Sequence, residues 1–144
     1  MITIFEEYTY TEYTYTEPNY TRIDLGDFIN KNKGLYSQYD NFGDKVYFFT
    51  KEIKDKLKEM VIGKVISFTT TNWHRRSFDI KNIEITDLIL DVAFYENDEE
   101  VEIIFKTARN DSRYMDFGKI TIWDDDSEMT KDVKLKIEAE KYNL

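Results

Sequence analysis

The apolar residues change their spacing at Lys64, and this change constrains the fold more than any other feature of the sequence. Before it, apolar residues recur at helical spacing, at Ile53, Leu57, and Met60 or Val61. With Thr50 as N-cap and Gly63 as terminator, they predict one firm helix over about residues 51–62. After Lys64 the apolar residues alternate with polar ones, as in β-strands. The chain therefore predicts an α+β fold, a mainly antiparallel sheet with this helix packed on it.

The clearest pair of strands is a hairpin over residues 88–105. Its apolar residues share one face before and after the turn: Leu88, Leu90, Val92 and Phe94, then Val101, Ile103 and Phe105. The turn itself is Glu96-Asn97-Asp98-Glu99. Because the helix has one apolar stripe and the hairpin one apolar face, we expect the two to be buried against each other.

Alternation predicts further strands over residues 46–49, 65–70, 78–86, 117–123 and 133–140. The phase of the third of these changes at Lys81-Asn82, which indicates a bulge. The last segment is predicted to be a strand because its apolar residues alternate with Lys and Glu, at Val133, Leu135, Ile137 and Ala139.

Residues 24–33 predict a second, short helix, with Asp24 as N-cap and Gly34 at its C-terminal end. Its inward residues are predicted to be Leu25, Phe28 and Ile29. The residues that follow, up to Lys45, are rich in Tyr, Asn, Gly and Asp and are predicted to form a loop.

The N-terminus contains a five-residue repeat of Tyr and Thr that begins at Glu7, again at Glu12, and in degenerate form at Glu17. Tyr and Thr favour extended backbone. An odd period, however, turns the side chains to the opposite sheet face at every repeat. The repeat either supplies a strand that Pro18 ends or forms an exposed, tyrosine-rich contact surface.

The length of 144 residues predicts a single domain over residues 1–144. With 41% apolar and 16% aromatic residues, the chain has ample material for one core. The absence of cysteine excludes disulfides, a thiol nucleophile and cysteine-ligated metals. No apolar run approaches the ~20 residues of a membrane span, and the first residues lack the pattern of a signal peptide. We therefore expect a cytoplasmic protein without membrane contact.

The net charge of −9 is unevenly distributed along the chain. Residues 1–27 carry −5 and residues 91–128 carry −8, whereas residues 28–90 carry +3 and residues 129–144 carry +1. Two acidic segments thus flank a mildly basic middle. Such segregation favours a protein that recognises partners through charge, although acidic loops in an ordinary protein also produce it.

Few residues point to catalysis. His74 is the only histidine, which excludes sites that need two, and the chain has no P-loop, Rossmann glycine pattern or nucleophile elbow. Asp79-Ile80-Lys81 has the spacing of half a metal-dependent nuclease site, which chance provides in a chain so rich in Asp and Lys. The acidic run from Asp124 to Glu128 lacks the glycine and distant glutamate of an EF-hand, which favours a solvated loop over a cation site. We predict no catalytic residue, metal or cofactor.

Two arginine-aromatic segments are candidates for a ligand pocket. Their residues are Trp73, Arg75 and Arg76 in one segment, and Arg109 and Arg113 in the other. Arginine binds phosphate or carboxylate through two nitrogens, and tryptophan stacks on bases. If both segments lie at one end of the sheet, they would hold a phosphorylated nucleotide. Otherwise these arginines pair with the surplus carboxylates.

The acidic hairpin is the stronger candidate for a binding surface. Carboxylates on alternate strand residues lie about 6.8 Å apart, at ~3.4 Å per residue. The predicted row comprises Glu96, Asp98, Glu100 and Glu102, extended by Asp124, Asp125 and Asp126 if the two segments are neighbours. Such a row repels nucleic acid and attracts basic proteins. The alternative is a soluble protein with acidic turns.

These observations predict a non-catalytic binding protein whose partner has a basic surface. The first hypothesis is an inhibitor from a phage or mobile element that blocks a nucleic-acid-binding or defence (CRISPR-like) enzyme, in one form as a nucleic-acid mimic. An immunity protein against a basic nuclease toxin is a close variant. The alternative from another class is a small-ligand binder, or sponge, for a phosphorylated nucleotide. No direct nucleic-acid binding is expected.

Overall fold

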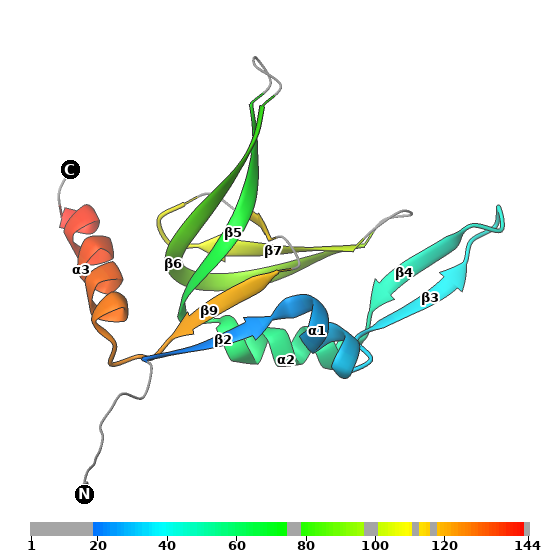
Figure 1. Ribbon diagram of the computed structural model, residues 1–144, viewed down its shortest axis with the longest axis horizontal. Helices are drawn as coiled ribbons and strands as arrows, with labels where there is room; N and C mark the ends of the chain where they lie inside the picture. The colour runs from blue at the N-terminus through cyan, green and yellow to red at the C-terminus, as the bar shows by residue number, and fades with distance from the viewer. Residues whose placement is uncertain (1–18, 75–78, 97–100, 111–112, 116–117, 143–144) are drawn as a thin grey trace, which may run out of the picture.

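The computed structural model describes residues 19–74, 79–96, 101–110, 113–115 and 118–142 (Figure 1). Along the chain these residues form β2 (Tyr20–Asp24), α1 (Leu25–Lys31), β3 (Leu35–Tyr39), β4 (Lys45–Phe49), α2 (Lys51–Val61), β5 (Val65–His74), β6 (Asp79–Glu96), β7 (Val101–Thr107), β8 (Arg113–Met115), β9 (Lys119–Trp123) and α3 (Glu128–Tyr142). The α+β prediction is confirmed. The Tyr/Thr repeat before Pro18 lies outside the described residues.

The strands form two antiparallel sheets. The larger has six strands in the order β2-β9-β5-β6-β7-β8, and the smaller is the β3–β4 hairpin. β9 pairs with β5 only over residues 65–67 of β5. Beyond that point β5 and the first half of β6 leave the sheet as a two-stranded arm, while the β3–β4 hairpin projects in another direction (Figure 1).

The main core lies between one face of the large sheet and helices α1 and α2. The predicted partners, helix and hairpin, meet there: Ile53, Leu57, Val61, Val92, Ile103 and Phe105 are buried, with Phe94 and Val101 packed at the edge. Phe68 and Phe105 meet edge to face, with ring centroids 5.0 Å apart. Joint burial of the helical stripe and the hairpin face is therefore confirmed.

Both predicted helix caps are present. Thr50 Oγ1 accepts the Ile53 N–H at 3.2 Å at the start of α2, and Asp24 accepts the Asp27 N–H at 3.0 Å at the start of α1. After α2 the chain turns through Gly63, whose φ of 82° is the left-handed conformation that glycine adopts without steric cost. The capping residues therefore fix where both helices begin.

The predicted strands 78–86 and 88–94 are one continuous strand, β6, and the predicted bulge is in the wrong place. The β5–β6 register runs unbroken through Lys81 and Asn82. The irregularity lies between Ile89 and Asp91, in the pairing with β7. It reverses the faces of the strand, so that Ile89 is buried and Leu90 is exposed. Leu90 therefore does not share the core face with the residues that follow it.

Two strands arise where the sequence predicted no strand. β3 pairs with β4 because a tight turn over residues 40–44 returns the chain on itself. β8 adds three residues to the edge of β7, opposite Ile103–Phe105. Neither strand shows apolar alternation, since few of the side chains of β3 are buried and β8 is too short to show a period.

The predicted C-terminal strand is wrong, since residues 128–142 form helix α3. Ser127 caps it, because Ser127 Oγ accepts the Thr130 N–H at 3.1 Å, and Thr130 Oγ1 donates to the Asp124 carbonyl at 2.7 Å. The residues that follow are mostly Lys, Glu, Leu and Ala, which favour helix over strand. The cap and these propensities outweigh the alternation, and the acidic run from Asp124 to Glu128 serves as the entry to a helix.

Candidate functional site

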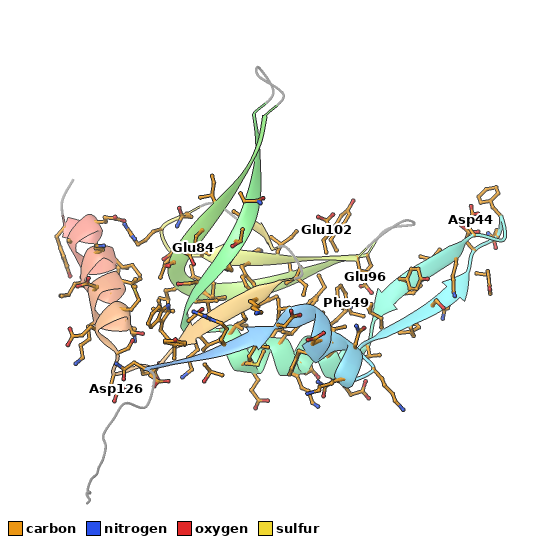
Figure 2. All side chains as sticks on the ribbon, in the orientation of Figure 1. Asp44, Phe49, Glu84, Glu96, Glu102 and Asp126 are labelled. Carbon is orange, nitrogen blue, oxygen red and sulfur yellow. The ribbon has the colours of Figure 1, made fainter. Side chains whose placement is uncertain are left out.

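Glu96, the first residue of the predicted acidic row, is largely buried and has a structural role. Glu96 Oε2 accepts the Phe49 N–H at 2.9 Å, and Glu96 Oε1 lies 3.0 Å from Lys54 Nζ. Its side chain is 19% exposed, so it joins the end of β6 to β4 and α2 (Figure 2). Glu102 lies on β7 opposite Tyr95 and is half-buried. Asp98 and Glu100 lie outside the described residues.

Replacing Glu96 by Ala is expected to lower the free energy of unfolding by about 2 kcal/mol, because the Phe49 amide and the Lys54 ammonium lose their acceptor. Urea denaturation measures the loss. Exposed Asp44 provides the control, and Asp44→Ala is expected to change stability by less than about 0.5 kcal/mol. Equal stability of the two variants would contradict the structural role of Glu96.

The second acidic group does not extend the row. Trp123 pairs with Val65, and Val65 pairs with Leu88, eight residues before Glu96 on β6. At ~3.3 Å per residue this separates the two groups by about 26 Å along the strand. In Figure 2 Asp126 lies at the lower left, at the start of α3, whereas Glu96 lies on the other side of the sheet, beside Phe49. Of the three aspartates, Asp125 forms an ion pair with Lys64 at 3.0 Å, and all three are exposed.

The two arginine segments are also far apart. Trp73 pairs with Ile80 near the end of the β5–β6 arm, whereas Arg109 lies beside Asp87, seven residues further along β6 and about 23 Å away. Arg109 forms an ion pair with Glu140 of α3 at 3.2 Å. Arg113 belongs to β8, and Arg75 and Arg76 lie outside the described residues. The positions described do not form a common ligand pocket.

Asp87 is the most completely buried acidic side chain of the described chain, and the sequence did not single it out. Its Oδ2 accepts three hydrogen bonds from the segment after β7, from Arg109 N–H at 2.8 Å, Asn110 N–H at 3.1 Å and Asn110 Nδ2 at 2.9 Å. Its Oδ1 accepts the Leu88 N–H at 2.8 Å. Four donors around one buried carboxylate indicate a structural anchor for this segment.

Exposed aromatic side chains gather on the β3–β4 hairpin. The exposed fractions are 90% for Phe42, 74% for Tyr39, 46% for Tyr36 and 38% for Tyr47. Elsewhere in the described residues, only Tyr95 and Tyr142 are large aromatics with comparable exposure. Water-exposed rings on a projecting hairpin are a feature of protein-binding surfaces.

The tip of this hairpin is held by hydrogen bonds. Asp40 Oδ1 accepts the Phe42 N–H and the Asp44 N–H, both at 2.9 Å, and Asp40 N–H donates to the Asp44 carbonyl at 2.9 Å. Gly43 adopts a φ of 82°, which lets the turn close. Phe42 is therefore presented to solvent on a turn whose backbone is fixed before any partner arrives.

Side chains along the hairpin reinforce it. The rings of Tyr36 and Phe48, directly opposite each other, stack at 5.4 Å, and Lys45 Nζ lies 5.8 Å from the centre of the Tyr47 ring. A pocket of about 280 Å³ opens beside them, lined by Gln38, Tyr39, Asp40, Val46 and Phe48. Its aromatic walls and acidic rim suit a long side chain with an apolar stem and a cationic head.

The aromatic hairpin and the acidic hairpin project from the same end of the molecule. Phe49 at the base of β4 meets Phe94 edge to face at 5.2 Å and is hydrogen-bonded to Glu96. In Figure 2, Glu96 and Glu102 lie beside this junction and Asp44 lies at the far tip. The aromatic side chains lie on both faces of the β3–β4 hairpin, with Tyr36 on one face and Tyr39 and Tyr47 on the other. We call this end, defined by Tyr36, Tyr39, Phe42, Asp44, Tyr47 and Glu102, the aromatic-acidic surface. The sequence signal that marks it is the Asp40-to-Asp44 turn, with aspartates at both ends and a glycine.

One ionisable group in the described chain has a shifted pKa. The hydrogen bond and the charge of Asp55, 2.7 Å from Lys51 Nζ, raise the pKa of this ammonium on the outer side of α2. In the described residues, no group of three or more His, Asp or Glu side chains is placed to hold a metal ion. No helix in the described ranges is long and apolar enough to cross a membrane.

Comparison of the chain with protein-family models, with curated proteins and with solved structures gave no match.

Proposed function

We propose that this chain is a non-catalytic binding protein that recognises a basic protein partner through its aromatic-acidic surface. The observation that carries this proposal is the presentation of Phe42, 90% exposed, on a turn fixed by Asp40. Burying one such ring at an interface contributes about 1.5–3 kcal/mol. Because the turn is already ordered, little of that gain is lost to ordering on binding.

The carboxylates of the surface define the chemistry of the partner. Asp44 is exposed, Asp40 lies at the rim of the pocket beside Tyr39, and Glu102 lies at the adjoining hairpin. The whole chain carries a net charge of −9. These charges steer a basic surface toward the aromatic anchors and repel nucleic acid. A lysine or arginine of the partner would lie along Tyr39 and Phe48 with its head near Asp40.

This chemistry fits an inhibitor of a nucleic-acid-binding enzyme. Such enzymes carry basic grooves, and an aromatic anchor flanked by carboxylates engages such a groove where nucleic acid would otherwise bind. A phage or mobile-element protein that blocks a defence (CRISPR-like) enzyme in the cytoplasm is the form we favour. An immunity protein that covers a basic nuclease toxin uses the same surface.

The test is binding to a panel of purified basic nucleases and CRISPR effector enzymes, measured by biolayer interferometry at several salt concentrations. For an enzyme that binds, Phe42→Ala is expected to weaken affinity about 30-fold, mainly through faster dissociation, as for a central interface anchor. Tyr142, 82% exposed at the end of α3, provides the control, and Tyr142→Ala is expected to leave affinity unchanged.

Charge is tested separately from the anchor. Asp44→Lys is expected to slow association and reduce its salt dependence, since an exposed charge screened over ~8 Å acts mainly on the association rate. Glu96 is left intact in this variant because its side chain holds Phe49 and Lys54. The proposal fails if no basic enzyme binds, if Phe42→Ala binds as tightly as the native chain, or if the protein binds DNA or RNA directly at physiological salt.

A further inference from the structure

The outer face of the large sheet, opposite the main core, is ordered in rows across its strands. Tyr20, Trp123, Val65 and Leu88 are directly opposite one another and form the first row. Val65 is buried outside the main core, as is Val133 of α3, and α3 lies against β5 and β6. The first row is therefore the apolar part of this face, at the end that α3 covers.

The second row is polar and contains three hydroxyl groups and one arginine, which are connected in pairs by hydrogen bonds. Ser67 Oγ accepts the Trp123 indole N–H at 2.9 Å and shares a hydrogen bond of 2.6 Å with Thr86 Oγ1. Arg22 Nε donates to Thr121 Oγ1 at 3.4 Å. Ser67 and Thr121 are both buried. Arg22, Thr121, Ser67 and Thr86 thus form a polar row across four strands.

The third row is charged and lies where the sheet divides. The β5–β9 pairing ends at Ser67 and Thr121. The next residues of the two strands on this face, Thr69 and Lys119, therefore border the fork where the arm departs. Glu84 lies opposite Thr69 on β6. A pocket of about 180 Å³ lies at this fork. It is lined by Phe68 and by residues of the second and third rows: Arg22, Ser67, Thr69, Glu84, Lys119 and Thr121.

The charged groups of this pocket have no ion-pair partner within the described structure, although Arg22 donates to Thr121 Oγ1 and its guanidinium lies 5.2 Å from the centre of the Tyr20 ring. Arg22 and Lys119 form no ion pair with any described carboxylate, and Glu84 forms none with any described cation. This contrasts with Lys54, Lys64 and Arg109, each of which has an acidic partner. Two cations beside buried hydroxyl groups match the oxygens of a phosphate or carboxylate, which accept hydrogen bonds from both kinds of group.

We infer that this pocket binds a small anionic metabolite, held at its phosphate or carboxylate by Arg22 and Lys119. Lys119 and Glu84 both line the pocket, on β9 and β6, with β5 between these two strands in the sheet order. Glu84 therefore accepts a hydroxyl or ammonium group from the other end of the ligand. Because 180 Å³ is below the ~300 Å³ of pockets for drug-sized ligands, the pocket admits a metabolite of amino-acid size and excludes a dinucleotide.

The test uses inorganic phosphate and O-phosphoserine as probes on the full chain, followed by chemical shifts of backbone amides and of the Trp123 indole N–H. Both probes are expected to bind saturably and to shift the signals of Ser67 and Thr121, which line the pocket, and of the Trp123 indole, which donates to Ser67 Oγ. Lys119→Ala is expected to weaken both probes at least tenfold. Exposed Lys136 of α3 supplies the matched control, and Lys136→Ala is expected to change neither affinity.

Glu84→Gln tests the binding of the ammonium end of the ligand separately from that of its phosphate. It is expected to weaken O-phosphoserine, whose ammonium loses the carboxylate, and to leave phosphate affinity unchanged or slightly raised. The variants change exposed side chains, and an unshifted remainder of the spectrum verifies that each is folded. The inference is overturned if neither probe binds saturably, or if Lys119→Ala and Lys136→Ala weaken phosphate equally. Partner binding through Phe42 does not enter this assay, so either proposal can fail without the other.

Discussion

Asp87→Ala is expected to lower the free energy of unfolding by about 4 kcal/mol, the largest effect we expect from any single substitution in this chain. The carboxylate is completely buried and accepts four hydrogen bonds, three of them on one oxygen. Hydrogen bonds to a charged group contribute about 1.5–3 kcal/mol each, and buried donors left without an acceptor add a desolvation cost. Water that reaches the Arg109–Asn110 segment offsets part of the loss. Urea denaturation followed by tryptophan fluorescence measures it.

Asp91 is a matched control for this prediction, since it lies on the same strand and its Oδ1 accepts the next amide, that of Val92, at 2.8 Å. Unlike Asp87, it is exposed. Asp91→Ala is expected to cost less than about 1 kcal/mol. Asp87→Asn is a second test variant. It keeps the shape of the side chain but places an NH₂ group, itself a donor, among the N–H donors that Asp87 accepts. A stable Asp87→Asn protein would show that shape, and not the four accepted hydrogen bonds, makes Asp87 important.

The spacing of apolar residues correctly predicted the elements that are buried on one side and exposed on the other. Helix α2 shows its stripe of Ile53, Leu57 and Val61 because one side contacts the sheet and the other contacts water. β7 shows its alternation for the same reason, with Ile103 and Phe105 inward. In both cases the local pattern in the sequence and the tertiary environment agree.

Prediction failed where the tertiary environment and the local pattern differ. In α3 only Thr130 and Val133 are buried, so the helix shows no apolar stripe, and Leu135, 67% exposed, made the segment resemble an alternating strand. In β6 the irregularity at Ile89–Asp91 reverses the faces, which a fixed period of two cannot represent. Attention to Ser127 as an N-cap would have corrected the first error.

The candidate surfaces were harder to predict than the fold. Charge indicated the acidic hairpin, but it could not show that Glu96 is turned inward to Phe49 and Lys54. Nor could it show that the Asp124–Asp126 group follows Trp123, which the register places level with Leu88 and far from Glu96 on β6. The aromatic side chains of β3 and of the turn after it fall in the segment predicted as a loop, because exposed aromatics follow no period. Binding surfaces are by nature exceptions to the burial patterns on which sequence interpretation depends.

Gly34→Ala is expected to lower the free energy of unfolding by about 2–3 kcal/mol, because the space for a methyl group is already filled. A Cβ at this position would lie 2.7 Å from Ile53 Cγ1, 2.9 Å from Ile53 Cβ and 3.0 Å from Ile29 Cγ2. The backbone cannot move away easily. Gly34 N–H donates to the Ile29 carbonyl, and its own carbonyl accepts the Thr50 N–H, both at 2.8 Å. Overpacking of this kind typically costs 1–3 kcal/mol.

Gly118 makes the prediction specific to packing, because a Cβ there would meet no atom within 4 Å. Gly118→Ala is expected to be neutral or slightly stabilising, since alanine reduces the entropy of the unfolded chain. A double-mutant cycle then identifies the contact. Ile53→Ala removes Cγ1, so Gly34→Ala should cost about 1 kcal/mol less in that background than in the native chain. If the two substitutions are additive, the contact with Ile53 Cγ1 does not contribute to the cost, which then arises from the contacts that remain in that background, with Ile53 Cβ and Ile29 Cγ2.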